Sequence, residues 1–326
     1  MLNRRALLAG AIALAGLPRG TAAQPAILLK AADVHVDRYP TVEAVRFIGS
    51  VLERETAGRI GIRVYHSGQL GRETDTVDLV RHGVLQMTRV FFGALNNAFP
   101  LSSVLGLPYV FDSTEHMRHS VDGPVGATVR ASFAARGLVG LAIYDSGVRC
   151  FYNTLRPVHV PADLAGLKLR VPPSDMFIAL VRALGGNPTP LPYGEMFSAL
   201  QTRLIDGGEN NVRSFHSSRQ FEVARFWSLT EHSYAPEALL MSRQAFDALS
   251  AADRALLTDA ADESVRHMRV LWDKSVADAD AAIRAAGVAV NEANLPAFRR
   301  AAGPLVQRYL QDPELARLHD AIRAAA

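Results

Sequence analysis

Hydrophobic residues near the start of the chain follow two spacings in turn, which predicts alternating strands and helices. Runs of apolar or alternating residues that indicate strands lie at 26–32, 60–64 and 84–90. After the first run, apolar residues recur at helical spacing, so we expect Thr41 to cap a helix that ends at Gly58. After the second, the same spacing predicts a helix over about 73–82. This order predicts a parallel α/β sheet with helices on both faces.

The middle of the chain continues the same pattern. Ser113 is expected to cap a helix that runs to Gly137, and Ser174 to cap another helix. Further strands are predicted at 138–144, 148–153 and 167–171, a strand and turn at 205–211, and further helices at 175–184 and 194–203. At 145–147 and again at 234–238 we expect the chain to cross between two lobes.

The segment 251–286 contains neither glycine nor proline. Its apolar residues mark one helical face, and a continuous helix over this segment would be about 54 Å long. Such a helix exceeds the length of an ordinary domain helix and would lie across both lobes as a spine. The alternative is a pair of helices that break near Asp273.

The length of 326 residues also favours two lobes, because it exceeds what one hydrophobic core usually supports. With the crossings placed as above, the first lobe is expected to comprise 24–146 and 236–273. The second lobe is expected to comprise 147–235 and 274–326.

Residues 1–23 are interpreted as an export signal: Arg4 and Arg5 precede an apolar stretch at 6–17, and small residues follow at 21–23. The arginine pair is compatible with both Sec and twin-arginine export, and the alternative is a disordered or membrane-anchoring N-terminus. Of 35 basic and 32 acidic residues, three basic ones and no acidic one lie in this segment, so the remainder is neutral. A neutral chain without a basic run gives no electrostatic basis for nucleic-acid binding. We expect the mature protein in the periplasm.

Few residues in the sequence suggest catalysis. It contains no GxGxxG, P-loop, HExxH or GxSxG pattern. Cys150 is the only cysteine, which excludes an internal disulfide and a cysteine-based metal site, and we expect it to be a packed core thiol. His116 and His119 share a helix face and are interpreted as exposed residues rather than metal ligands. Neither a cofactor nor a metal ion is expected.

Two arginines lie where strands are expected to reach a cleft between the lobes. Apolar residues alternate along 167–171, so Arg170 lies on the opposite face of that strand, close to its carboxyl end. Parallel α/β sheets bind ligands outside these ends, and a guanidinium there can hold a carboxylate through two parallel hydrogen bonds. Arg149 occupies a similar place on the neighbouring predicted strand. The alternative for each is a surface arginine in a loose ion pair.

Other polar and aromatic residues are candidates for further ligand contacts. Asn210 and Asn211 follow a predicted strand directly and can donate and accept hydrogen bonds, although asparagine and glycine are also ordinary turn residues. Tyr193 precedes a helix N-terminus, where it would stack on a ligand ring or pack on the hinge. His35 and Glu73 lie in the first lobe, on a predicted loop and at a helix start, and are otherwise solvated loop residues.

Several stretches of this sequence together resemble the DctP-type solute-binding subunit of tripartite ATP-independent periplasmic (TRAP) transporters. They are 67–71 (SGQLG), 107–111 (LPYVF), 163–171 (DLAGLKLRV), 192–201 (PYGEMFSALQ) and 205–210 (IDGGEN). The resemblance extends over nearly the whole chain after residue 23. It implies an α/β, two-lobed, periplasmic-binding-protein-like fold that closes by a hinge, with a long helix spanning both lobes.

The resemblance also implies roles for individual residues. Arg170 would grip the carboxylate of the substrate, and Arg149 would assist it. Asn210 would contact the ligand, and Tyr193 would line the pocket. The protein would be a non-enzymatic binding protein, expected to be a monomer, that delivers a small organic acid to the membrane permease subunits of a TRAP transporter.

The stretches 145–149, 173–175 and 209–211 resemble a branch of the family associated with hexuronates such as galacturonate and glucuronate. Two arginines would match one carboxylate, while Asn211, Glu73 and His35 would contact sugar hydroxyls. Phe91 departs from this pattern, because some sugar-acid-binding members have a polar residue there. An apolar surface at that position suits a smaller or less hydroxylated acid, so a keto acid, an aldonate and a dicarboxylate are the alternative ligands.

Two other functions stay open from the sequence. One is an exported enzyme acting on sugar acids, for which Glu209 and Glu73 would be the general acid and base. The other is a sensor module that passes ligand-induced closure to a membrane kinase.

Overall fold

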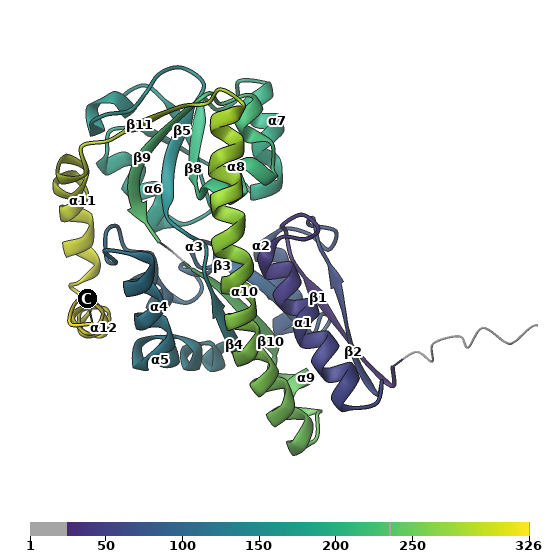
Figure 1. Ribbon diagram of the computed structural model, residues 1–326. Coiled ribbons are helices and arrows are strands. Elements are labelled where there is room, and N and C mark those ends of the chain that lie inside the picture. Colours follow the sequence, from purple (N-terminus) through teal and green to yellow (C-terminus); the bar gives the residue numbers. More distant parts are fainter. Residues whose placement is uncertain (1–24, 235, 326) are drawn as a thin grey trace, which may run out of the picture.

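The described part of the chain forms two β-sheets, each covered by helices, with a long helix running past both (Figure 1). The structure is a computed structural model, and it describes residues 25–234 and 236–325. The predicted export signal at 1–23 lies outside the described residues. The mixed α/β architecture with a sheet in each lobe confirms the predicted fold class.

Within these ranges the first-lobe sheet has five strands in the order β2-β1-β3-β10-β4. Their bounds are β1 Ile27–Ala32, β2 Ile60–Tyr65, β3 Met87–Phe91, β4 Leu138–Tyr144 and β10 Glu237–Ser242. β1 is parallel to β2 and β3, as predicted, but β10 is antiparallel to both β3 and β4. The sequence analysis predicted no strand at β10, which is antiparallel because it arrives from the second lobe and not through a crossover helix.

The second-lobe sheet has six strands in the described residues, in the order β11-β9-β5-β8-β6-β7. Their bounds are β5 Arg149–Asn153, β6 Lys168–Val171, β7 Asn187–Pro190, β8 Gly207–Asn210, β9 Phe226–Ser233 and β11 Ala289–Glu292. β5 is antiparallel to β8, whereas β6 and β8 are parallel. The start of β5 therefore lies at the same edge of the sheet as the ends of β6 and β8. The expectation that β5 and β6 are neighbours is wrong, since β8 lies between them.

Helices cover both sheets and fill the connections between strands. Their bounds are α1 Pro40–Glu55, α2 Glu73–Arg81, α3 Phe92–Leu95, α4 Thr114–Asp122, α5 Pro124–Ser132, α6 Asp175–Ala183, α7 Met196–Gln201, α8 Val212–Ser217, α9 Arg243–Asp247, α10 Ala251–Ala285, α11 Leu295–Tyr309 and α12 Pro313–Arg323. Thr41 does not cap α1, because Tyr39 holds the N-cap position. The Thr41 hydroxyl instead donates to Asp33 Oδ2 at 3.0 Å.

The helix predicted from Ser113 to Gly137 is divided into α4 and α5. Ser113 caps α4 as predicted, its Oγ accepting from the backbone N–H of His116 at 3.0 Å. Pro124 then starts α5, because a proline has no N–H to continue the hydrogen bonding of α4. His116 was expected to be exposed but is buried, and its Nε2 donates to the carbonyl oxygen of Ile322 at 2.8 Å.

The helix α10 is one uninterrupted helix of 35 residues and confirms the predicted spine. It passes Asp273 without a break, so the alternative of two helices is wrong. Met268 and Trp272 belong to a core cluster of the first lobe, whereas Ile283 belongs to a cluster of the second lobe. One rod is therefore anchored in the cores of both lobes.

The first crossing between the lobes is held by buried charge. Asp145 follows β4, and its carboxylate accepts from Arg118 Nε at 2.6 Å and from Arg269 Nε at 3.2 Å. Arg118 belongs to α4 and Arg269 to α10, so the crossing is tied to both helices. Two residues later, Gly147 has a φ of +65° and lies against the Trp272 ring.

The end of the chain returns towards the first lobe. α11 packs on α6 and β9 of the second lobe, and α12 packs on α5 and on the 3₁₀ helix Pro100–Gly106. The prediction placed all of 274–326 in the second lobe, whereas α12 contacts elements of the first. The exact division into lobes stays a prediction.

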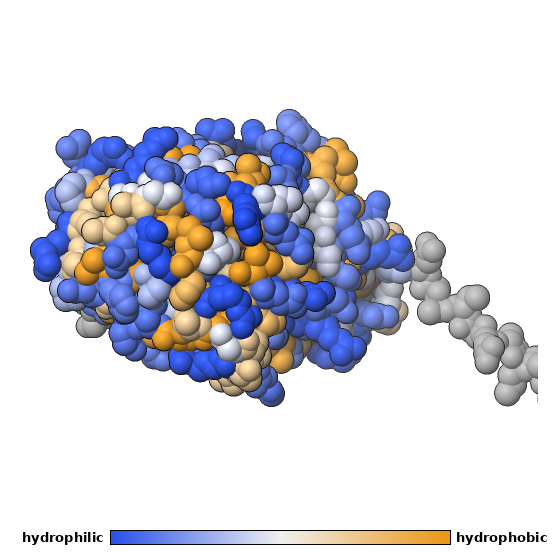
Figure 2. Space-filling view, turned by 90° about the horizontal axis from the view of Figure 1, so that it is seen from above, coloured by the Kyte–Doolittle hydropathy of each residue, from blue (hydrophilic) through white to orange (hydrophobic). Residues whose placement is uncertain are grey.

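No helix in the described ranges is both long enough and apolar enough to cross a membrane. Figure 2, which looks onto the top of Figure 1, shows hydrophilic side chains over most of that face, with apolar ones in scattered groups.

Gly147→Ala tests the packing of the first crossing. We expect it to lower the free energy of unfolding by about 2–4 kcal/mol, because the positive φ and the Trp272 ring both oppose a Cβ. Trp272 Cζ2 would lie 2.9 Å from that Cβ. Gly166→Ala is the matched control, since Gly166 has a φ of +80° with no atom within 4 Å of the added Cβ, and it should cost about 1 kcal/mol. Equal losses in urea denaturation would contradict a steric role for Trp272.

Candidate ligand-binding site

An outer cavity and a smaller inner one adjoin between the two lobes. The outer cavity has a volume of about 350 Å³, which is in the range of small-molecule sites. The inner one has about 20 Å³, room for about one water molecule. Both are lined by Val34 and Glu73 from the first lobe and by Arg170 and Tyr193 from the second. The site therefore uses side chains that lobe closure brings together.

Arg170 is a buried cation without a carboxylate partner. It lies on β6 with 3% of its surface exposed, so the alternative of a surface arginine is wrong. Its Nε donates to the carbonyl oxygen of Leu191 at 2.8 Å, while its Nη atoms have no hydrogen bond or ion pair with any described residue. Burial lowers the pKa of Arg170, but a guanidinium stays charged at neutral pH. These Nη atoms are available to an anion in the cavities.

Arg149 lines the inner cavity but is already paired. Its Nε and Nη2 lie 2.5 Å and 2.8 Å from the two carboxylate oxygens of Glu209, and its Nη1 donates to Asn210 Oδ1 at 3.1 Å. Burial raises the pKa of Glu209, but the Arg149 charge and the hydrogen bond to His232 outweigh it and hold that pKa at about 2. Arg149 thus serves the site as a fixed donor rather than as a free cation.

The Arg149 guanidinium lies on an aromatic platform. Its Cζ is 4.4 Å from the centroid of the Phe91 ring and 5.5 Å from that of Phe177. Such distances are those of a cation–π interaction. Phe91 also lines the inner cavity. The departure noted in the sequence at this position therefore has a structural role in supporting Arg149.

The two asparagines at the end of β8, its last residue and the one that follows it, have different surroundings. Asn210 lines the inner cavity, where its Oδ1 accepts from Arg149 and from the backbone N–H of Asn211. Its amide Nδ2 has no partner among the described residues and can donate to a ligand. Asn211 lines neither cavity: its Oδ1 caps α8 by accepting from the backbone N–H of Ser214 at 2.7 Å. The structure therefore does not bring Asn211 to the cavities as expected.

On the first-lobe side, Arg89 is surrounded by carboxylates. It lies on β3 and forms ion pairs with Asp33, with Glu73 at 2.9 Å and with Glu237 at 3.3 Å. Glu73 Oε1 also accepts from the backbone N–H of Phe91 at 2.9 Å. Burial raises the pKa values of Glu73 and Glu237, and Arg89 opposes this. Arg89 therefore holds the three carboxylates in place, and they outnumber its single positive charge.

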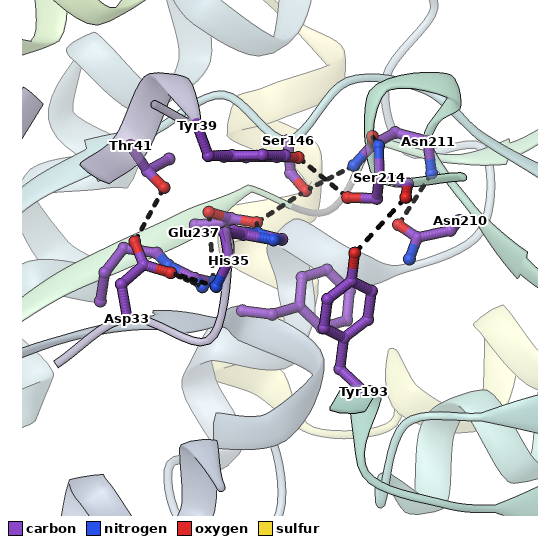
Figure 3. Close-up of polar contacts among 12 residues, drawn as sticks. Asp33, His35, Tyr39, Thr41, Ser146, Tyr193, Asn210, Asn211, Ser214 and Glu237 are labelled. Atoms are coloured by element: carbon purple, nitrogen blue, oxygen red, sulfur yellow. Dashed lines mark hydrogen bonds and ion pairs between the residues drawn. The ribbon is translucent and has the colours of Figure 1, made fainter. Parts of the chain in front are cut away.

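His35 and Glu237 connect this wall to the hinge (Figure 3). His35 Nε2 lies 3.2 Å from Glu237 Oε1, which also accepts from the Ser146 hydroxyl at 3.1 Å. The His35 ring stacks on Tyr39 with centroids 3.7 Å apart. Burial, with the nearby Arg89 charge, lowers the pKa of His35 well below its usual range, so the ring is neutral. Its buried Nδ1 has no partner in the structure.

Tyr193 lies between the two cavities and reaches across to the first lobe. Figure 3 shows its hydroxyl directed towards Ser214, whose carbonyl oxygen it meets at 3.4 Å. Its ring meets His35 edge to face, with centroids 5.3 Å apart. Both of the roles expected for Tyr193 are compatible with this position, since the ring lines the pocket and also packs beside the hinge.

Taken together, these groups suit a ligand with one negative end and several hydroxyl groups. Arg170 supplies an unpaired charge, Asn210 and Arg149 supply oriented donors, and Glu73 supplies acceptors. No group of three or more His, Cys, Asp or Glu side chains in the described ranges is arranged to hold a metal ion. The sequence interpretation missed Arg89 and Glu237, although a lone arginine in the apolar run 84–90 was a usable signal.

Comparison with known proteins gives a consistent picture. A family profile described as bacterial extracellular solute-binding protein, family 7 (DctP) matches residues 31–312. Among solved structures, a TRAP periplasmic solute-binding protein from Bradyrhizobium sp. BTAi1 in complex with α/β-D-galacturonate is 45% identical, with a TM-score of 0.89 over 91% of this chain and 99% of that one.

Two further solved TRAP periplasmic solute-binding proteins are similarly close. One from Xanthobacter autotrophicus Py2 with bound β-D-galacturonate is 41% identical, with a TM-score of 0.90 over 91% of this chain and 100% of that one. Another from Roseobacter denitrificans with bound β-D-glucuronate is 36% identical, with a TM-score of 0.88 over 91% and 99%.

Glu209→Gln tests the buried ion pair behind the site. At pH 7 we expect the free energy of unfolding of the variant to be about 3–5 kcal/mol lower than that of the native protein, because Arg149 would stay buried without its counter-charge. Glu209 has a folded pKa of about 2 against an ordinary 4.5, so its contribution is present above pH 4.5 and is lost as the pH falls towards 2. The difference in the free energy of unfolding between the two proteins, measured by chemical denaturation, should therefore become smaller as the pH falls from 4.5 towards 2. A difference that stays constant with pH would contradict the assignment.

Proposed function

This chain belongs to the DctP family of bacterial extracellular solute-binding proteins, family 7, and from this premise we propose that it binds a hexuronate between its lobes. The preferred ligands are D-galacturonate and D-glucuronate. The observation that carries the proposal is Arg170, a buried guanidinium that lines both cavities and has no carboxylate partner among the described residues. A ligand carboxylate would supply the missing charge in the closed site.

The remaining polar groups match the rest of a sugar acid. Hydroxyl groups both donate and accept, so they can meet the amide of Asn210 and the carboxylate of Glu73 at the same time. The His35 Nδ1 atom, which is buried without a partner, offers one more contact. The galacturonate and glucuronate held by the three similar structures support the same ligand class. A keto acid or a short dicarboxylate would leave several of these groups unpaired.

Delivery to a TRAP permease and a periplasmic location are parts of the same proposal. They are supported by the family and by the periplasmic solute-binding proteins of TRAP systems that this chain resembles. Transfer would require the lobes to open, which exposes the ligand and separates Arg170 from the groups of the first lobe.

Binding without chemical change is favoured over catalysis. A glutamate that acts as a general acid needs a pKa near the working pH, whereas the Arg149 pair holds the pKa of Glu209 at about 2. Glu209 also lines neither cavity. Glu73 would then be without the partner that the enzyme hypothesis requires. The sensor hypothesis differs from transport only in the protein that receives the closed form.

Arg170→Ala tests the proposed function directly. We expect the native protein to bind D-galacturonate or D-glucuronate and the variant to bind at least about 100-fold more weakly, because a desolvated carboxylate would lose its charge partner. Isothermal titration calorimetry of protein refolded free of ligand measures both affinities. A thermal-shift screen with keto acids, aldonates and dicarboxylates, run in parallel, separates the alternative ligands.

Lys168→Ala is the matched control for this measurement. Lys168 lies on the same strand but is 48% exposed, and its Nζ contacts the carbonyl oxygen of Arg203 away from the cavities. Its removal should leave the affinity unchanged. Unchanged affinity in Arg170→Ala, with a native circular dichroism spectrum, would refute the assignment of the carboxylate to this residue.

Incubation of the native protein with D-galacturonate tests the absence of catalysis. The one-dimensional proton NMR spectrum of the sugar acid should stay the same at a stoichiometric protein concentration, because Glu209, one of the two carboxylates that the enzyme hypothesis names, lines neither cavity. Loss of the substrate signals in the native protein and their persistence in Glu73→Gln would favour the enzyme hypothesis.

A further inference from the structure

The two walls of the site carry opposite charge. On the first-lobe side, the three carboxylates Asp33, Glu73 and Glu237 surround Arg89, and His35 is neutral. On the second-lobe wall, Glu209 neutralises Arg149, which leaves the charge of Arg170. The first-lobe wall is therefore acidic and the second-lobe wall is basic.

The acidic wall presents free acceptor capacity to a ligand. Glu73 is the first residue of α2 and lines both cavities. Its Oε1 takes the contacts from Arg89 and from the backbone N–H of Phe91. Its Oε2 accepts no hydrogen bond from any described residue. Buried Glu237 Oε2 likewise lacks a hydrogen bond, although Arg89 Nη1 lies 3.3 Å away.

Among the described residues that line the cavities, no second arginine lacks a carboxylate partner and could receive another anionic group. Arg72 also lines the outer cavity, but its Nη2 lies 2.9 Å from Glu195 Oε1. Arg89 and Arg149 are committed to carboxylates of the chain. Within the described residues, Arg170 alone among the arginines that line these cavities has no carboxylate partner.

We propose that the acidic wall around Glu73 selects ligands with a single carboxylate and rejects those with a second carboxylate at the far end. This inference rests on the proposed function and narrows it. A hydroxyl group opposite Arg170 donates a hydrogen bond to Glu73, whereas a carboxylate at that position meets a like charge with little water to screen it. The site would accept hexuronates and aldonates, whose far end is uncharged. It would exclude aldarates and C4-dicarboxylates, which have a carboxylate at that end. Specificity would arise from repulsion as much as from attraction.

The linear sugar acids galactonate and galactarate isolate this effect. They share one carbon chain and one set of inner hydroxyls, and differ only in a terminal CH2OH against a carboxylate. In calorimetry at pH 7, we expect the native protein to bind galactarate at least about 100-fold more weakly than galactonate. Equal affinities, or tighter binding of galactarate, would overturn the inference.

Glu73→Gln identifies the residue responsible. Glutamine keeps the acceptor for Arg89 and Phe91 but removes the charge, so the ratio of the two affinities should fall by about 10-fold or more. Asp78→Asn removes the same charge from an exposed position on α2, where Asp78 pairs with Arg81, and should leave the ratio unchanged. A ratio that persists in Glu73→Gln, or one that relaxes equally in Asp78→Asn, would refute selection by Glu73.

Separate measurements distinguish failure of this inference from failure of the proposed function. Hexuronate binding by the native protein tests the function, and the ratio for the two linear acids tests the selection. If the native protein binds neither linear acid, Glu73→Lys provides the second test by placing a cation in the first-lobe wall. Binding of galactarate without galactonate by that variant supports the inference, and binding of neither contradicts it.

Discussion

The site depends on one buried charge that the protein leaves unpaired. Bringing the Arg170 guanidinium out of water costs several kcal/mol, and no carboxylate of the described chain forms an ion pair with it. Arg149, which also lines the inner cavity, shows the alternative, because it is paired with the Glu209 carboxylate. The chain therefore contains one arginine that is structurally satisfied and one that is not. A ligand carboxylate completes the second pair, which links occupancy of the site to stability of the closed form.

The fold delivers these charges through the same arrangement in both lobes. In each sheet, the carboxyl ends of parallel strands meet the start of an antiparallel strand at the edge that faces the other lobe. Arg149 begins β5 and Glu237 begins β10, so both antiparallel strands contribute their first residue to the cavity wall. Ser146 and Glu237 then join the two crossings by a hydrogen bond. The ligand groups and the hinge are thereby parts of one polar network.

Local patterns predicted most of the elements, and they failed where distant residues decide the outcome. The spine helix and the strand that carries Arg170 follow from spacing alone, because periodicity and missing glycine or proline are local signals. The antiparallel entry of β10 and the pairing of Arg149 with Glu209 depend on contacts between segments far apart in sequence. Asn211 is a second example. The sequence suggested its side chain as a contact for a sugar hydroxyl, but that side chain caps α8 instead. Residue type indicated a polar site correctly, but it could not show which polar groups the protein itself would use.

The continuity of α10 restricts how the two lobes can separate. Because Trp272 and Ile283 are embedded in different cores, a change of lobe angle cannot be absorbed by the connecting strands alone. The rod must flex between these anchor points, or one end must slide over its core. Bending of the helix would store elastic strain that pulls the two lobes back together. This restoring force would favour closure of the lobes after the ligand is released. It would also limit how far the lobes can open.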